Sequence, residues 1–157
     1  MAPLQFWEHL PRLKYSVVMP RAVRSEHRFH DHSHAFFELA LVLEGRCGWR
    51  VGRRHTHHLE TGDSLLIAPE VFHHERIPEG SSARIAWVGF DFESEPRVPS
   101  PLLSPVRSGV HSDELKHLLQ LIFAEHQSTA LGSAERALLA LRDTLIVFCR
   151  ALESPAI

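Results

Sequence analysis

An alternating stretch at residues 37–43 constrains the fold of this chain most strongly. Phenylalanine and leucine occupy the odd positions, and Glu38, Ala40 and Val42 occupy the even ones. This period of two is typical of a β-strand whose two faces are both largely buried. Glycine-containing turns separate it from further strand candidates, at 48–51, 55–59, 64–67 and 83–92. Many short strands at this spacing predict a sandwich or a barrel.

A proline-rich stretch ends this β region, and a helical pattern follows it. Residues 93–111 carry four prolines, which can continue neither a central strand nor a helix. Ser112 can cap a first helix, Gly132 is expected to end it, and Ser133 can cap a second helix. We therefore predict a connector followed by two helices.

The second predicted helix carries an apolar seam. Its residues step by three and four positions, as in a heptad repeat, at Leu138, Leu141, Leu145, Phe148 and Leu152. Leu139 and Ile146 widen the apolar surface beyond that seam. Two helices that only pack on the barrel would explain the pattern, but the wide surface favours a hairpin that also pairs with a second copy of the chain.

Composition and charge indicate one globular domain and exclude some partners. The chain has 157 residues, of which 44% are hydrophobic, and a formal net charge of −2. That charge gives the chain as a whole no attraction to nucleic acid, and no apolar run approaches membrane-spanning length. Cys47 and Cys149 make no disulfide framework, and the N-terminus lacks a signal-peptide pattern. We expect a cytoplasmic protein that does not contact membranes.

Histidine is concentrated in the first half of the chain, where ten of the thirteen lie before residue 75. If the strand extends backwards, His32, His34 and Glu38 share one face and leucines line the other. Buried imidazoles and a carboxylate must be paired, hydrated or metal-bound. Such nitrogen and oxygen ligands suit Zn, Ni, Mn, Fe or Co and do not choose among these metals. His30 shares this face and is expected at the mouth of the barrel.

The spacing of these residues resembles the first motif of the cupin proteins. It reads His32-x-His34-x3-Glu38-x6-Gly45, and Glu26 stands where the motif has its leading glycine. The resemblance implies a mainly β fold, in which a double-stranded β-helix or jelly-roll barrel is followed by a C-terminal helical hairpin.

A second stretch, residues 62–73, resembles the second cupin motif and ends on His73. Ala68 replaces the usual proline, Glu70 replaces the usual glycine, and Ile77 falls where the motif has its final asparagine. Together the two stretches resemble one branch of the family, the sensor domains of AraC-type bacterial transcription regulators.

The resemblance to that branch implies a ligand-sensing and dimerisation domain. Such a domain binds a small effector, often a sugar, in its barrel. It thereby controls DNA binding by a C-terminal module with two helix-turn-helix units, which these 157 residues do not contain. The expected organisation is an arm and barrel over 1–92, a connector over 93–111 and a two-helix dimerisation segment over 112–157. The expected partners are a small-molecule effector, a second copy of the chain through the C-terminal helices, and DNA only through the C-terminal module.

The expected effector pocket has six residues: His32, His34, Glu38, His73, Glu75 and Trp87. Glu75 is included because it shares the strand parity of His73, and a surface salt bridge is its alternative role. The first four also complete a metal-ligand set, although related sensors can keep these positions as pocket walls without a metal. A sugar-sensing relative stacks a tryptophan on its ligand near the end of the last long strand. Trp87 matches that tryptophan, although Ile85 stands where the relative has a histidine, and a tryptophan that only fills the barrel is the alternative.

The N-terminal arm and the metal-ligand set each leave a choice open. Phe6, Trp7 and Tyr15 either close over the pocket or anchor the arm as an extra strand. The complete ligand set is also compatible with a stand-alone metal-dependent cupin enzyme, such as an isomerase or a dioxygenase. The sequence contains no other catalytic constellation, so we prefer the interpretation as a sensor domain over that as an enzyme.

Overall fold

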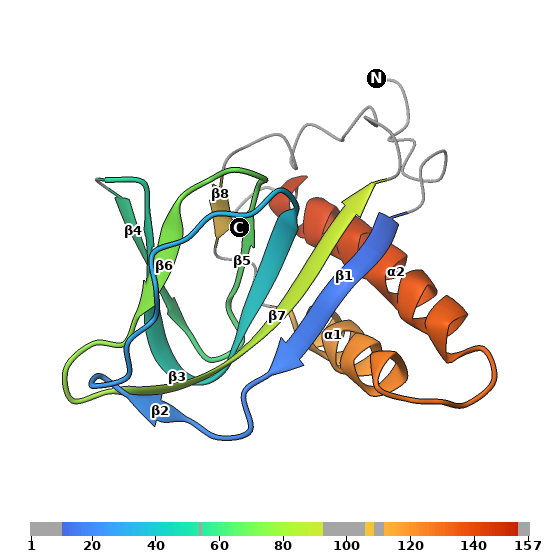
Figure 1. Cartoon of the computed structure of the whole chain (residues 1–157), viewed down its shortest axis with the longest axis horizontal. Coiled ribbons are helices and arrows are strands. Elements are labelled where there is room, and N and C mark those ends of the chain that lie inside the picture. Colours follow the sequence, from blue (N-terminus) through green and yellow to red (C-terminus); the bar gives the residue numbers. More distant parts are fainter. Residues whose placement is uncertain (1–10, 54, 93–105, 109–111, 154–157) are drawn as a thin grey trace.

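The computed structural model describes residues 11–53, 55–92, 106–108 and 112–153 (Figure 1). Eight strands precede two helices: β1 (Pro11–Val18), β2 (Val23–Arg24), β3 (Phe37–Val51), β4 (His55–Glu60), β5 (Ser64–Ile67), β6 (His73–Arg76), β7 (Ser82–Phe92), β8 (Val106–Ser108), α1 (Asp113–His126) and α2 (Ser133–Glu153). The two helices contact each other. The predicted mainly β fold followed by a helical hairpin is therefore confirmed.

β3 is the strand on which both halves of the β structure are built. Its first part pairs with β5 and β7 on either side, and β1 extends this sheet beyond β7. Its last part pairs with β4 and β6 instead. Residues 37–43 and 48–51 were expected as separate strands, and this was wrong because a single strand of 15 residues runs through both. Figure 1 shows this strand curving from one sheet into the other.

The two faces of β3 line two different cores, as the alternating pattern predicted. Leu39, Leu41 and Leu43 pack against the two helices. Ala40 and Val42 face the interior of the barrel. Burial of both faces explains why the strand carries apolar residues at odd and even positions alike.

A bulge in β3 reverses which positions face the barrel interior. The pairing with β7 shifts between Val42 and Glu44, and Gly45 follows with a φ of 82°. Beyond it the interior positions are odd, with Cys47, Trp49 and Val51 in the barrel core. An extra residue in one strand shifts the two-residue alternation in this way.

The helices cover the side of the β1-β7-β3 sheet that faces away from β4 and β6 (Figure 1). Ser112 caps α1 as predicted, since its side chain accepts a hydrogen bond of 3.2 Å from the Leu115 amide. Gly132 does not end α1, which stops at His126; Gly132 has a φ of 78° and lies just before α2. No helix among the described residues is both long and apolar enough to cross a membrane.

The apolar seam of α2 is only partly buried. Leu141, Leu145 and Phe148 are buried against the sheet. Leu138 and Leu139 keep 37% and 64% of their side-chain area exposed. The chain therefore leaves an apolar strip on α2 that its own sheet does not cover.

The predicted connector contains one strand. β8 lies within residues 93–111 and pairs with β5. The remainder of that stretch, like Phe6 and Trp7 of the arm, lies outside the described residues. The boundaries at 92, 111 and 157 stay predictions.

Candidate metal and effector site

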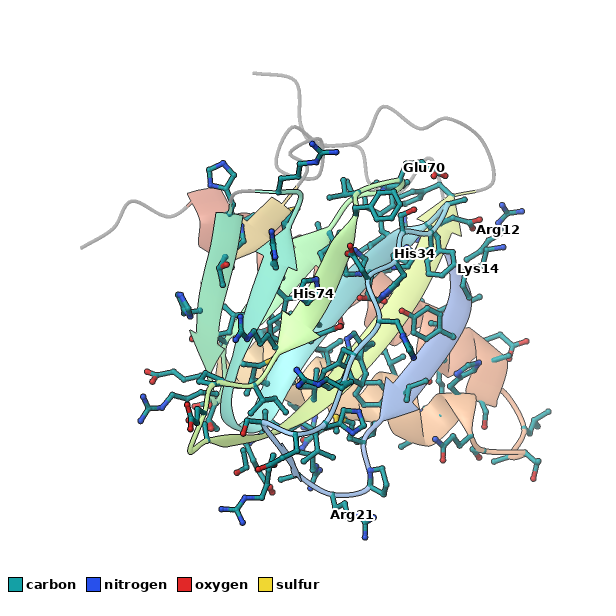
Figure 2. The ribbon with its side chains drawn as sticks, turned by 60° about the vertical axis from the view of Figure 1, so that its left-hand side comes forward. Arg12, Lys14, Arg21, His34, Glu70 and His74 are labelled. Carbon is teal, nitrogen blue, oxygen red and sulfur yellow. The ribbon has the colours of Figure 1, made fainter. Side chains whose placement is uncertain are left out.

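Backbone pairing brings the histidine segment to the site. Residues 30–36 were expected to continue the strand, but β3 begins only at Phe37. Instead, His32 and His73 form an isolated antiparallel bridge, with backbone hydrogen bonds of 3.1 and 2.9 Å. The Glu70 amide also donates to the His34 carbonyl at 2.8 Å, and Figure 2 labels both residues at the same end of the barrel. These bonds fix the segment beside β6 and β3.

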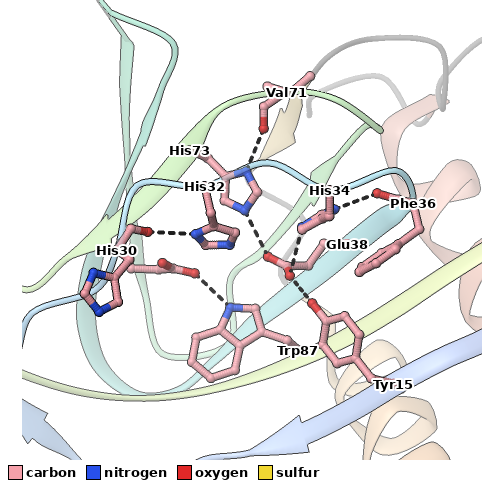
Figure 3. A network of polar contacts seen from close by, with 10 residues as sticks. Tyr15, His30, His32, His34, Phe36, Glu38, Val71, His73 and Trp87 are labelled. Atoms are coloured by element: carbon pink, nitrogen blue, oxygen red, sulfur yellow. Dashed lines mark hydrogen bonds and ion pairs between the residues drawn. The ribbon is translucent and has the colours of Figure 1, made fainter.

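Four side chains converge at this place (Figure 3). His32, His34, Glu38 and His73 each offer one ligand atom, and these atoms all lie within 4.8 Å of one another. The Nε2 atoms of His34 and His73 lie 3.2 and 3.4 Å from the two carboxylate oxygens of Glu38. Glu38 and His73 are buried, and the other two are half-buried.

The backbone fixes which nitrogen of each imidazole faces the cluster. Nδ1 of His32, His34 and His73 lies 2.7, 2.9 and 2.8 Å from a main-chain carbonyl oxygen two residues away. A carbonyl can only accept, so each Nδ1 carries the proton and each neutral ring keeps a lone pair on Nε2. Carbonyl partners of this kind are what orients histidine ligands in metal sites.

Several atoms at the centre of the cluster lack a hydrogen-bond partner. Nε2 of His34, Nε2 of His73 and Oε1 of Glu38 are all buried and without a hydrogen bond among the described residues. Lone pairs on nitrogen facing a carboxylate repel one another unless a cation lies between them, which is either a second proton on the ring at Nε2 or a metal ion. The donor set of three imidazole nitrogens and one carboxylate oxygen therefore fits a divalent transition metal.

Electrostatics keep the cluster negative at its centre. Burial acts to raise the pKa of Glu38, but the contacts with His34, His73 and Tyr15 outweigh burial and lower it to about 2. Burial acts to lower the pKa of His73, and Glu38 together with the Val71 carbonyl raises it. Glu38 is therefore a carboxylate at neutral pH, although it is almost without contact with water.

Tyr15, which was expected either to close over the pocket or to anchor the arm as an extra strand, contacts the cluster directly. It lies on β1, so the arm contributes an extra strand here, and its hydroxyl donates to Oε2 of Glu38 (Figure 3). Burial and the neighbouring Glu38 raise the pKa of Tyr15, which keeps the phenol protonated. Gly89 makes room for the ring, since a β-carbon there would lie 2.3 Å from Cε1 of Tyr15.

A hollow of about 310 Å³ opens beside the cluster. Of the six predicted pocket residues, four line it: His32, Glu38, Glu75 and Trp87. His34 and His73 do not line this hollow and contact Glu38 instead. His30 lines it too, as expected for a residue at the mouth, and Phe29 and Val17 were not foreseen.

Glu75 and Trp87 form a polar pair in the wall of this hollow. The indole Nε1 of Trp87 donates to Oε1 of Glu75 at 3.0 Å. Glu75 is buried, and burial and the nearby Glu38 raise its pKa. The sequence left Glu75 between a pocket wall and a surface salt bridge, and its position is in the pocket wall.

Four other histidines of this half lie away from the cluster. His55 and His58 are exposed on β4, and His57 between them is half-buried. His74 points to the opposite face from His73, and its Nδ1 lies 3.5 Å from Oδ1 of Asp31.

Replacing Tyr15 with phenylalanine is expected to destabilise the metal-free protein by about 1.5–3 kcal/mol, because Glu38 loses a hydrogen bond to its charged form. Urea denaturation in the presence of a chelator measures the change. Ser16→Ala is the matched control on the same strand. It loses a bond to His126 at the surface and should cost about 1 kcal/mol or less. Equal losses for the two variants would contradict the assigned role of the phenol.

Replacing Glu70 with glycine is expected to stabilise the protein by about 0.5–1 kcal/mol. Glu70 has a φ of 65°, and a side chain at such a φ costs more than the flexibility that glycine adds to the unfolded chain. This is also the position where the cupin motif usually has glycine. Thermal and urea denaturation measure the gain. Glu60→Gly, on β4, should instead lower stability, and a loss for Glu70→Gly would show that the Glu70 side chain stabilises the turn.

Comparisons with known proteins agree with this geometry. The model of the AraC-like ligand binding domain matches residues 15–144, which include every residue of the cluster and the hollow. No curated protein matches the chain.

Several solved structures are similar over part of the chain. The iron(II) form of HppE in complex with its substrate has 28% identity and a TM-score of 0.42, over 48% of this chain and 44% of its own. A cupin-2 domain protein from Shewanella frigidimarina has 22% identity and a TM-score of 0.39, over 50% and 76% of the two chains. YhaK from Escherichia coli has 12% identity and a TM-score of 0.46, over 68% and 52%. This chain thus spans less than half the length of the first of these structures.

Proposed function

Because this chain belongs to the family of AraC-like ligand binding domains, we propose that it is a sensor that binds a small effector beside a divalent transition metal. The observation that carries the proposal is the set of buried lone pairs on His34, His73 and Glu38, which have no hydrogen-bond partner among the described residues. His32, His34, Glu38 and His73 would hold this metal, and their donor atoms suit Zn, Ni, Mn or Fe.

The residues around the hollow define the effector class. A bound metal ion supplies a Lewis-acidic centre that attracts an oxygen atom of the effector. Trp87 and Phe29 offer aromatic surface suited to the C–H face of a small ring, and Glu75 accepts hydrogen bonds from hydroxyl groups. We propose a small polar molecule that bears both oxygen donors and an apolar face, such as a sugar or a hydroxy acid.

β1 carries the signal from the site to the helices. Neighbouring residues of this strand face opposite ways: Tyr15 contacts Glu38, and Oγ of Ser16 lies 2.6 Å from Nδ1 of His126 at the end of α1. β1 also packs on α2. An effector that favours one position of β1 also favours the helix arrangement that goes with that position. The coupling free energy between the two sites is typically about 1–3 kcal/mol.

The helix surface pairs with a second copy of the chain. Leu138 and Leu139 are adjacent, exposed leucines on α2, and apolar side chains exposed on a helix are suited to a contact with a second copy. In the proposed regulator, DNA is bound by a separate module, and the effector changes how two such modules are spaced.

One experiment tests the sensor function. Metal-loaded protein is titrated calorimetrically with sugars, hydroxy acids and aromatic acids, and a true effector should bind at least tenfold more weakly to Trp87→Ala. Phe72→Ala is the matched control, because Phe72 is 59% exposed and outside the hollow. Sedimentation with and without the effector reports on the dimer. No binding by any compound, or equal binding by both variants, would overturn the proposal.

A metal-dependent enzyme is the second candidate function. The complete ligand set favours this candidate, since a bound metal would supply a Lewis-acidic centre, and Tyr15 donates a hydrogen bond to the ligand Glu38. Incubation of the metal-loaded protein with each bound compound distinguishes the two. Unchanged compound after many hours supports the sensor, and turnover that Tyr15→Phe lowers supports the enzyme.

A further inference from the structure

The outer face of the second sheet carries a glycine surrounded by basic residues. Along β3, the outward positions read Arg46, Gly48 and Arg50, because the interior positions here are odd. Gly48 is paired with His58 of β4 on one side and with Arg76 of β6 on the other. Residues two apart on a strand, and residues opposite one another on neighbouring strands, point to the same face. All four neighbours of Gly48 on this face are therefore basic.

This arrangement forms a hollow of about 490 Å³ on the outside of the barrel. Figure 2 is turned toward this side of the molecule and labels His74 on β6. Gly48 lies in the floor of the hollow and is itself buried, because the side chains of Thr56 and His58 lean over it. Arg50, Arg53 and Arg76 line the hollow together with His58 and His74.

The basic groups of this hollow are poorly neutralised. Glu79 is the acidic residue of its lining, and Asp31 contacts His74 from the neighbouring segment. Among the described residues no ion pair engages Arg50, Arg53 or Arg76. The guanidinium of Arg50 does bond to the Arg53 carbonyl at 3.3 Å, which orders this arginine over the turn between β3 and β4. Three arginines against one lining glutamate leave the hollow positive, although the chain as a whole carries −2.

We propose that this hollow is a second ligand site, which binds the phosphoryl group of a small phosphorylated molecule between Arg50, Arg53 and Arg76. Guanidinium groups donate paired hydrogen bonds that match phosphate oxygens, and they keep their charge at any physiological pH. The arginines that line the hollow come from β3, from the turn after it and from β6. A tetrahedral phosphoryl group can use donors from several directions, whereas a planar carboxylate offers only two oxygens. The site lies on the opposite face of β3 from Trp49, so it is separate from the metal cluster in the barrel.

Calorimetry and phosphorus NMR with inorganic phosphate, glucose 6-phosphate and unphosphorylated glucose test the proposal on the whole chain. Phosphate should bind with a dissociation constant of about 1 mM or tighter. Tighter binding of glucose 6-phosphate would identify an organic phosphate as the ligand, and equal binding would identify free phosphate. The double variant Arg50→Gln/Arg76→Gln should lower affinity at least tenfold. Both side chains are exposed, so their replacement should leave the fold intact.

Two controls make the result decisive. Arg142→Gln removes one positive charge from α2, on the far side of the molecule, against the two that the double variant removes, and should change affinity less than twofold. His73→Ala removes a metal ligand and leaves the outer hollow unchanged. If this variant loses phosphate binding while the double variant keeps it, the phosphate binds at the metal cluster and the proposal is overturned. An equal effect of Arg142→Gln and the double variant would show general charge attraction only. Binding of DNA by a chain that binds neither inorganic phosphate nor glucose 6-phosphate would also overturn the proposal.

Discussion

Replacing His73 with alanine is expected to lower the affinity of the protein for Zn, Ni, Mn or Fe by about 100-fold or more. The change removes one of the four ligand atoms that lie within 4.8 Å of one another, and even residues that only support a ligand are worth 10–100-fold. It also removes the imidazole ring that the backbone orients, through the contact of 2.8 Å between Nδ1 of His73 and the Val71 carbonyl oxygen. Competition with a chromophoric chelator measures the affinity, and elemental analysis of protein made without a histidine tag measures the metal content.

His74→Ala is the matched control for this variant. His74 neighbours His73 but faces outward and contacts Asp31, so its loss should leave metal affinity within about twofold of the original protein. Circular dichroism verifies that both variants are folded. Stoichiometric metal retained by His73→Ala would refute the assignment of the cluster as the metal site, and the hollow beside it would then be an effector pocket without a metal.

Replacing Gly45 with alanine is expected to destabilise the protein by about 3–5 kcal/mol, which is enough to unfold many domains of this size. Two costs combine. A β-carbon at Gly45 would lie 1.8 Å from the Ser82 carbonyl oxygen, and the φ of 82° disfavours any side chain. Relief of the clash would separate β3 from β7 at the bulge, which is where the barrel interior changes from even to odd positions. Urea denaturation, or the yield of soluble protein where folding fails, measures the effect.

Gly52→Ala separates the two costs. Gly52 also has a positive φ, of 61°, but a β-carbon there would meet nothing within 4 Å. This variant should lose about 1 kcal/mol, from the backbone conformation alone. If both variants lost the same amount, the close approach of β3 to Ser82 would contribute nothing.

Local patterns predicted much of the fold. The alternation over 37–43 predicted a strand with two buried faces because each face has its own set of apolar residues, and Leu41 and Ala40 do lie in different cores. The cap at Ser112 was predictable because a serine before two acidic residues satisfies the first amides of a helix within a few positions of itself. Such signals act between near neighbours, so a single sequence contains them.

Features that depend on distant pairing were not predictable in the same way. Tyr15 reaches Glu38 because β1 pairs with β7, and nothing near Tyr15 in the sequence specifies that pairing. The bulge before Gly45 shifts the alternation, so parity counted from His32 fails beyond Val42. The histidines reach Glu38 through a backbone bridge to His73 and not through a continued strand. The predicted residues come together, but for a different structural reason.

The continuity of β3 limits how molecules can enter and leave the barrel. One unbroken strand belongs to both sheets, with β7 bonded to its first part and β6 bonded to its last. The two sheets therefore cannot move apart without breaking backbone hydrogen bonds of this strand. The backbone of the segment at 25–36 is attached more lightly, by the two hydrogen bonds between His32 and His73 and the one between Glu70 and His34. In the metal-free protein, exchange of a ligand should thus occur by local release of this segment, at a rate set by a few hydrogen bonds and independent of the overall stability of the fold, and a metal held by His32 and His34 should slow it.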